Sequence, residues 1–354
     1  MAKGKTGKLI IHAGDHKAGS TALQYAFVNK AVRLSGATLS YPTALNANQV
    51  FDPLKPKNGG TAKPARIKGL AKRIAKDAAD YTVVSAESLD SARPKLVKEI
   101  CDTYFAPIAD QIAVISYVRP HAARVVSSFA EITKIGGETS TLEAFHKQTL
   151  RGKRFVYTPR FSAWLHTFGD DFMLRPMVRD QLEGASVVDD FAAHAFPEVK
   201  YRIKQVKTGN ESASLRQLMV FRVLHQRLNA FPPGLRLAVG WSVAKHLAAN
   251  DAMQGPKLYL HQALLRKVHK DYIDDARSMD QKFFGGRPVL ATELEAALDQ
   301  APVQKQSLVP QDHLSSDEIA LIHAMGDHTA EMLRLEADWN KHFRKGRIEA
   351  AKPD

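Results

Sequence analysis

The stretch KLIIHAGDHKAGSTALQ, residues 8–24, decides the fold predicted for this chain. It begins with an apolar run, continues with a short polar segment bounded by Gly14 and Gly19, and ends with the composition of a helix. A strand that enters a glycine-containing turn and then a helix brings loop N–H groups and the positive end of the helix dipole together. The stretch therefore predicts an anion-binding loop between a strand and a helix.

The glycines of this loop have the spacing of a nucleotide-binding P-loop, but the lysine does not have its usual position. Four residues separate Gly14 from Gly19, and Ser20 follows, as in that motif. The motif places its lysine after the second glycine, whereas Lys17 lies inside the loop. The pattern indicates a phosphate cradle with a displaced cation, which lowers the expectation of ATP chemistry. The alternative is that the segment binds no phosphate and is a simple glycine turn between strand and helix with a solvated lysine.

The segment KAGST at residues 17–21 resembles the 5′-phosphosulfate loop of sulfotransferases, including bacterial members, which use 3′-phosphoadenylyl sulfate (PAPS) as donor. The common form in that family is Lys-Thr-Gly-Ser/Thr-Thr, so Ala18 removes one hydroxyl but no backbone donor. The resemblance implies a P-loop-like α/β fold and a donor site formed by Lys17, Ala18, Gly19, Ser20 and Thr21.

A second segment, RPHAARVVSSFAEITK at residues 119–134, resembles the 3′-phosphate motif of the same family. In that motif an arginine at the end of a strand precedes a helical serine by eight residues, and Arg119 and Ser127 have this spacing. A guanidinium group can bind a terminal phosphate through two parallel hydrogen bonds. We expect Arg119 and Ser127 to bind the donor, whereas a surface arginine and an ordinary helical serine are the alternative.

A candidate base follows the apolar segment YTVVSA, residues 81–86. Transfer to a hydroxyl or amine requires a group that takes the acceptor proton, and a carboxylate can do this. The family resemblance implies Glu87 for this role, since glycan-modifying sulfotransferases use a glutamate after the corresponding strand. His16, next to Lys17, is the rival base, and a helix-entry carboxylate is the alternative for Glu87.

The order of apolar segments predicts a covered parallel sheet. Strands expected near residues 9–11, 81–86, 111–118 and 171–174 alternate with helices, the first of them at about 20–34. A long surface loop is expected at 40–64. Since ligands of such sheets lie beyond the carboxyl ends of the strands, the loop, Glu87 and Arg119 should meet at one edge.

The second part of the chain has the composition of helices. Helices are expected at about 215–228, 240–250, 257–280, 291–299 and 315–344. We therefore expect an α/β donor-binding core at residues 1–200 and a mostly helical extension at residues 201–354, packed on that core.

Charge and cysteine content limit the partners and the compartment. The formal net charge of +13 favours anionic partners, and residues 55–76 contain eight basic and no acidic residues. A single cysteine, Cys101, excludes an internal disulfide and favours the cytosol. No apolar run is long enough to span a bilayer. The histidines lack the spacing of a metal-binding helix, so no metal is expected.

The sequence therefore predicts a PAPS-dependent sulfotransferase that transfers a sulfuryl group to a hydroxyl or amine. The basic segment at 55–76 favours an anionic or bulky glycan as acceptor, with a small alcohol or a lipid left open. A small-molecule kinase that uses the loop for ATP and a catalytically silent nucleotide-binding module are the alternatives. Nucleic acid is not expected as a partner, because basic segments interleaved with aromatic residues are missing.

Overall fold

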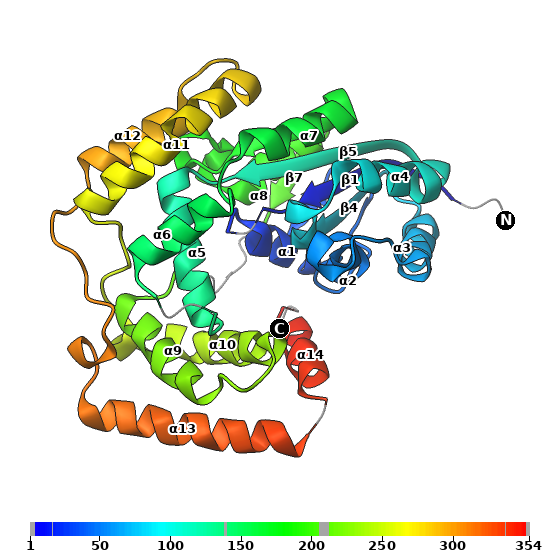
Figure 1. The fold of residues 1–354 in the computed structure, drawn as a ribbon. Helices are drawn as coiled ribbons and strands as arrows, with labels where there is room; N and C mark the ends of the chain where they lie inside the picture. The colour runs from blue at the N-terminus through cyan, green and yellow to red at the C-terminus, as the bar shows by residue number, and fades with distance from the viewer. Residues whose placement is uncertain (1–3, 16, 138–139, 205–211, 337, 352–354) are drawn as a thin grey trace.

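The structure, a computed structural model, describes residues 4–15, 17–137, 140–204, 212–336 and 338–351. At its centre lies a five-stranded parallel sheet with the strand order β3–β4–β1–β5–β6 (Figure 1). The strands are β1 (Thr6–Ala13), β3 (Leu39–Ser40), β4 (Tyr81–Ala86), β5 (Ala109–Val118) and β6 (Phe172–Pro176). The predicted α/β class with a parallel, helix-flanked sheet is confirmed.

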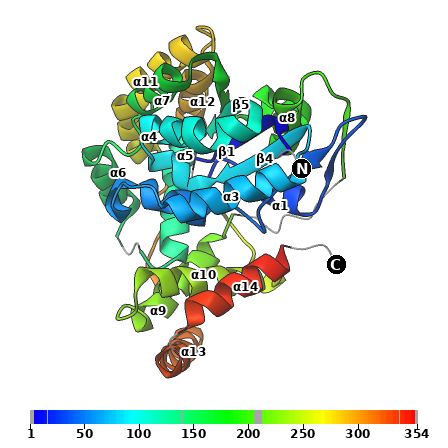
Figure 2. The same ribbon diagram turned by 90° about the vertical axis from the view of Figure 1, so that its right-hand side faces the viewer.

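Both faces of the sheet are buried, which explains why its strands are apolar without interruption. In β1, Leu9 and Ile11 belong to one hydrophobic core, and Ile10 between them belongs to the core on the opposite face. The first face is covered by α3 (Pro64–Asp77), α4 (Pro94–Ile100), α5 (His121–Lys134) and α7 (Thr158–Phe168). The second is covered by α1 (Ser20–Val28) and α8 (Val187–Ala195) (Figure 2).

Two local predictions in the first part of the chain are wrong. The first helix ends at Val28 instead of extending to residue 34, because the backbone enters the left-handed region at Lys30 (φ 51°). The next residues form β2 (Val32–Leu34), which pairs antiparallel with β7 (Tyr201–Ile203). The predicted loop at 40–64 contains a short helix, α2 (Asn48–Phe51).

The later part of the chain is mostly helical, as predicted, but its last helix is divided. The remaining helices are α6 (Leu142–Arg151), α9 (Leu215–Arg227), α10 (Pro233–Ala248), α11 (Gln262–Phe283), α12 (Val289–Asp299), α13 (Ser316–Leu335) and α14 (Trp339–Ala350). The predicted helix at 315–344 is wrong, since Glu336 has an extended backbone conformation between α13 and α14. One hydrophobic core runs continuously from the sheet through α5 to α9, α11 and α12.

The contact between α5 and α10 connects the two parts of the chain. A Cβ atom at Gly240 in α10 would lie 2.1 Å from the carbonyl oxygen of Lys134, so only glycine permits this close crossing. The ring of His225 in α9 also contacts that carbonyl oxygen, through Nε2 at 2.9 Å. The crossing brings α10, and α14 packed against it, toward the carboxyl edge of the sheet (Figure 1). No described helix is both long and apolar enough to cross a membrane.

Candidate functional site

The loop after β1 is a tight turn whose conformation depends on two left-handed residues. Lys17 has φ 65° and Gly19 has φ 83°. A Cβ atom at Gly19 would lie 2.9 Å from Cγ2 of Val187 in α8, so the glycine is required by both its conformation and its packing. The N–H of Gly14 donates to the carbonyl of Ala86 (3.2 Å), which fixes the start of the loop to β4. His16 lies outside the described residues.

The N-terminus of α1 has the features of an anion site. Among the described residues no side chain caps it, so the first N–H groups of the helix have no described side-chain acceptor. The Ser20 side chain is buried, and its Oγ has no hydrogen-bond partner among the described residues. A Cβ atom at Gly14 would lie 2.5 Å from this Oγ, so the glycine leaves room for the hydroxyl in the loop. The loop can therefore offer backbone N–H groups and one hydroxyl to an anionic oxygen.

Lys17 is held by a carboxylate from α5. Its Nζ lies 3.1 Å from Oε2 of Glu131, which also contacts Nζ of Lys134 at 2.6 Å. The other carboxylate oxygen, Oε1, accepts a hydrogen bond from Nε1 of Trp241 in α10 (2.9 Å). Burial alone would raise the pKa of Glu131, but the two lysines outweigh it and lower that pKa to about 2. The carboxylate therefore stays ionised at neutral pH and keeps Lys17 beside α5.

Arg119 contacts the loop directly. Its Nη1 donates to the carbonyl oxygen of Lys17 at 2.9 Å, and its own carbonyl accepts from the hydroxyl of Tyr157 at 3.0 Å. Burial, and next the neighbouring charge of Arg124, lower the pKa of Arg119. A nearby anion stabilises a cation whose charged form is disfavoured in this way. The structure thus brings the arginine of the second predicted motif to the loop of the first.

The other two predicted site residues lie on different elements: Ser127 is in α5, and Glu87 follows β4. The Ser127 hydroxyl donates within its own helix, to the carbonyl of Arg124 at 3.3 Å. Glu87 follows the last residue of β4, and the pairing of Ala13 with Ala86 places it beside the start of the loop. It is half-buried and interacts electrostatically with Arg347 of α14. Glu87 is therefore at the same edge of the sheet as Lys17 and Arg119.

A buried ion cluster that the sequence patterns did not indicate fixes the loop at Asp15. Asp15 is 1% exposed and accepts hydrogen bonds from Arg124 of α5 (2.9 Å) and Arg160 of α7 (3.1 and 3.3 Å). Arg124 lies on the apolar side of its helix, and a basic residue in that position normally has a buried partner. That pattern was the available signal. The sequence alone does not identify which carboxylate is the partner of Arg124.

The C-terminal helices also contribute to the site, which the sequence patterns did not indicate. Trp241 bonds to the carboxylate that holds Lys17, and the guanidinium of Arg347 lies 3.4 Å from the centre of the Trp241 ring. These residues are more than 100 positions from the loop, and no local pattern distinguishes them from surface residues.

The site therefore combines an uncapped helix N-terminus, a fixed lysine, an arginine and a carboxylate at one edge of a parallel sheet. This set can hold a phosphorylated ligand and place a base beside it. Among the described residues, no group of three His, Cys, Asp or Glu side chains could hold a metal ion. Comparisons with protein-family models, curated proteins and solved structures found no match for this chain.

Proposed function

We propose that this protein transfers a sulfuryl group from PAPS to a hydroxyl or amine of an acceptor. The observation that carries the proposal is the hydrogen bond from Arg119 Nη1 to the carbonyl of Lys17 (2.9 Å). Two segments 102 residues apart, each similar to a donor-binding motif of sulfotransferases, thereby meet at the carboxyl edge of the sheet. Either segment alone would be weak support, whereas their contact is what a single donor site requires.

The loop fits the phosphosulfate end of the proposed donor. The first N–H groups of α1 and the Ser20 hydroxyl have no side-chain acceptor in the described part of the chain, and phosphate oxygens would supply acceptors for them. Gly14 leaves room beside the Ser20 hydroxyl, and Gly19 permits the left-handed turn and its close packing against Val187. Arg119 would hold the 3′-phosphate, and Ser127, its predicted partner on the next helix, would contribute at most weakly, since its hydroxyl donates to the carbonyl of Arg124.

The chemistry required of the chain is positioning, charge neutralisation and proton transfer. Bound PAPS would supply an activated sulfuryl group joined to a phosphate oxygen. Lys17 would offset the negative charge that grows on that oxygen as the sulfur–oxygen bond breaks, and Glu131 holds the lysine in place for this task. Glu87 would take the proton from the attacking acceptor atom, and His16 is the rival for that role.

A thermal shift experiment tests the donor assignment. Adenosine 3′,5′-bisphosphate, the product of the proposed donor, and ATP with Mg²⁺ would each be added at matched concentrations. A ligand at about 100 times its Kd stabilises the folded state by about 2.7 kcal/mol, which raises the melting temperature measurably. We expect stabilisation by the bisphosphate and a much smaller effect of ATP–Mg²⁺.

The other results would exclude the proposal or part of it. Stabilisation by ATP–Mg²⁺ alone would indicate a small-molecule kinase, because the preferred nucleotide would lack a 3′-phosphate. Bisphosphate binding without sulfation of any acceptor in a broad panel would indicate a catalytically silent nucleotide-binding module. Arg202→Ala is a suitable control, since this exposed residue of β7 lies outside the site and should leave the shift unchanged.

A further inference from the structure

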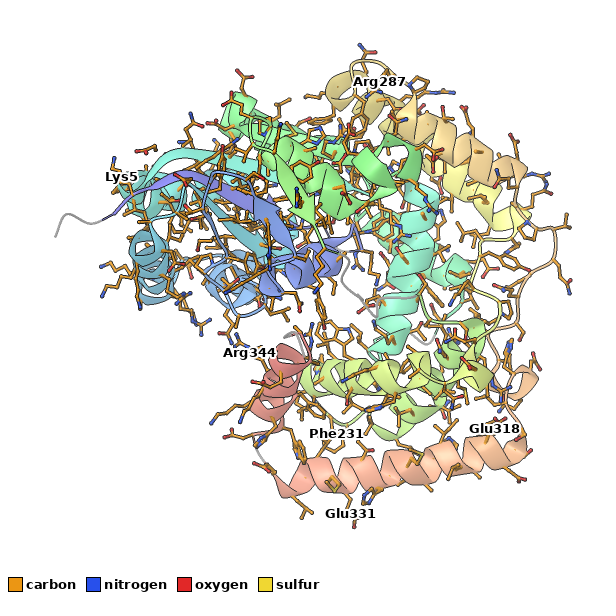
Figure 3. All side chains as sticks on the ribbon, turned by 180° about the vertical axis from the view of Figure 1, so that it is seen from behind. Lys5, Phe231, Arg287, Glu318, Glu331 and Arg344 are labelled. Carbon is orange, nitrogen blue, oxygen red and sulfur yellow. The ribbon has the colours of Figure 1, made fainter. Side chains whose placement is uncertain are left out.

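A cleft of about 720 Å³ lies between the segment 42–52, α10 and α14. Its lining includes Asn46, Asn48, Arg73, Trp241, Arg344 and Arg347. Figure 3 shows Arg344 on the side of α14 that faces the N-terminal half of the chain. Ligand pockets typically enclose about 300–1,000 Å³, so this cleft has room for a small molecule or a short saccharide.

The lining of the cleft carries an excess of positive charge. Arg73, Arg344 and Arg347 line it, and of these Arg347 interacts electrostatically with Glu87. Asp52, the acidic residue of the lining, is paired with Lys55 at 3.5 Å. Arg66 adds a further cation near Arg344, and burial together with Arg66 lowers the pKa of Arg344. Guanidinium groups placed together in a concave site attract anionic ligands.

The inner end of the cleft reaches the candidate site. Trp241 lines the cleft and donates to Glu131, the carboxylate that holds Lys17. On the opposite wall, Asn48 accepts hydrogen bonds from the backbone N–H (3.2 Å) and hydroxyl (3.3 Å) of Ser88, the neighbour of Glu87. A ligand in this cleft would therefore extend toward both the proposed base and the lysine.

We infer that this cleft binds the acceptor and that the acceptor carries an anionic group together with its reacting hydroxyl or amine. A carboxylate, phosphate or sulfate would lie on Arg73 and Arg344, and the reacting group would point to Glu87. The acceptor assignment rests on the proposed function. The C-terminal helix α14 thereby becomes part of the substrate site, since it supplies two of the three arginines.

The inference can be tested with pairs of probes that differ only in charge. We would measure binding of 4-nitrophenyl β-D-glucuronide against the neutral 4-nitrophenyl β-D-glucoside, and of glucose 6-phosphate against glucose, by calorimetry or ligand-observed NMR. At least one anionic probe should bind about tenfold or more tightly than its neutral partner, because guanidinium groups bind anions strongly. Arg344→Ala and Arg73→Ala should each remove most of that preference.

Lys345→Ala is the matched control, because Lys345 is exposed on α14 and lies outside the cleft lining. This variant should keep the preference, which separates a local effect from loss of net charge. Equal binding within both probe pairs, or a preference that survives Arg344→Ala and Arg73→Ala, would overturn the inference.

Adenosine 3′,5′-bisphosphate binding, measured on the same samples, separates this inference from the proposed function. Bisphosphate binding without a preference for anionic probes would refute the cleft assignment and leave the donor assignment intact. A preference for anionic probes without bisphosphate binding would show an anion site but refute the acceptor role. Arg344→Ala should leave bisphosphate affinity unchanged, since this residue lies in the acceptor cleft and not at the loop.

Discussion

The Nζ atom of Lys17 lies 3.1 Å from Oε2 of Glu131. The lysine of the loop after β1 is therefore held by α5, the helix that follows β5. Lys134 shares the same carboxylate, which leaves the three side chains with a net positive charge. A flexible lysine is thereby directed to one edge of the sheet before any ligand arrives. Such preorganisation is what electrostatic stabilisation of a developing charge requires.

Lys17→Ala should lower turnover by about 10²–10³, the typical cost of losing one preorganised charge-stabilising group. The measurement is steady-state sulfation with PAPS, after a thermal melt has shown that the variant is folded. Lys30→Ala is the matched control, because Lys30 is an exposed lysine with a similarly left-handed backbone (φ 51° against 65°). Turnover near that of the wild type in Lys17→Ala would contradict the role of the lysine.

Glu131→Gln should change how stability depends on acid. The pKa of Glu131 falls from 4.5 to about 2 on folding, so the ionised carboxylate stabilises the folded state above about pH 4.5. This contribution, at most about 3 kcal/mol, is lost as pH falls from 4.5 toward 2. Part of this stabilisation is offset by Lys134, because burial disfavours its charged form and lowers its pKa. The stability difference between wild type and Glu131→Gln, measured by urea unfolding, should therefore shrink over this range.

Glu99→Gln provides the control for that experiment, because Glu99 is an exposed glutamate of α4. Its effect on unfolding should be small at every pH, since exposed charges contribute little. A difference between wild type and Glu131→Gln that stays constant from neutral pH to about pH 3 would show that Glu131 is not preferentially stabilised as an anion.

The main features of the fold could be predicted from local sequence patterns. Apolar segments such as 81–86 and 111–118 are strands because both faces of a parallel sheet are buried. The end of α1 could not be predicted, because it depends on Lys30 adopting a left-handed conformation and on β7, more than 160 residues away, pairing with β2. The break after α13 could not be predicted either, because the sequence of residues 315–344 is compatible with one continuous helix.

The candidate site could be predicted only where its residues follow strands. The loop, Glu87 and Arg119 come after β1, β4 and β5, and parallel strands bring such positions together. The partners of these residues come from elsewhere, as the bond between Trp241 and Glu131 illustrates. That contact depends on the close crossing of α5 and α10 at Gly240, which no local pattern specifies.

Arg119→Ala should weaken binding of adenosine 3′,5′-bisphosphate by about 10–100-fold. A hydrogen bond to a charged group contributes about 1.5–3 kcal/mol, and the variant also loses the bond to the carbonyl of Lys17 that positions the loop. Ser127→Ala should weaken binding by no more than about threefold, since its hydroxyl already donates to the carbonyl of Arg124. Calorimetry measures both, with Arg202→Ala as control. Unchanged affinity in Arg119→Ala would remove this arginine from the donor site.

His12 should make the folded state sensitive to mild acid. Its side chain is fully buried beside Ser85, and burial lowers its pKa from 6.5 to about 3. Below about pH 6.5 the unfolded chain takes up a proton that the folded chain does not, so stability falls as pH decreases toward 3. Between pH 6.5 and pH 5 this effect amounts to about 2 kcal/mol.

The prediction for His12 is checked by urea unfolding of His12→Gln at about pH 7.5 and pH 5. The variant should lose less stability between these two pH values than the wild type. His246→Gln, a change at an exposed histidine of α10, should lose as much as the wild type. Equal losses in all three proteins would mean that His12 is protonated in the folded state at pH 5.

Glu87→Gln should lower turnover by about 10²–10⁴ while leaving bisphosphate affinity unchanged, because a general base acts on the acceptor and not on the donor. Glu87→Asp, which keeps a carboxylate, should recover part of the loss. Turnover and affinity would be measured on the same preparations, so that a misfolded variant is recognised by its loss of binding. If Glu87→Gln keeps nearly full turnover and His16→Gln does not, the acceptor proton passes to the histidine of the loop, and Glu87 serves instead as the electrostatic partner of Arg347.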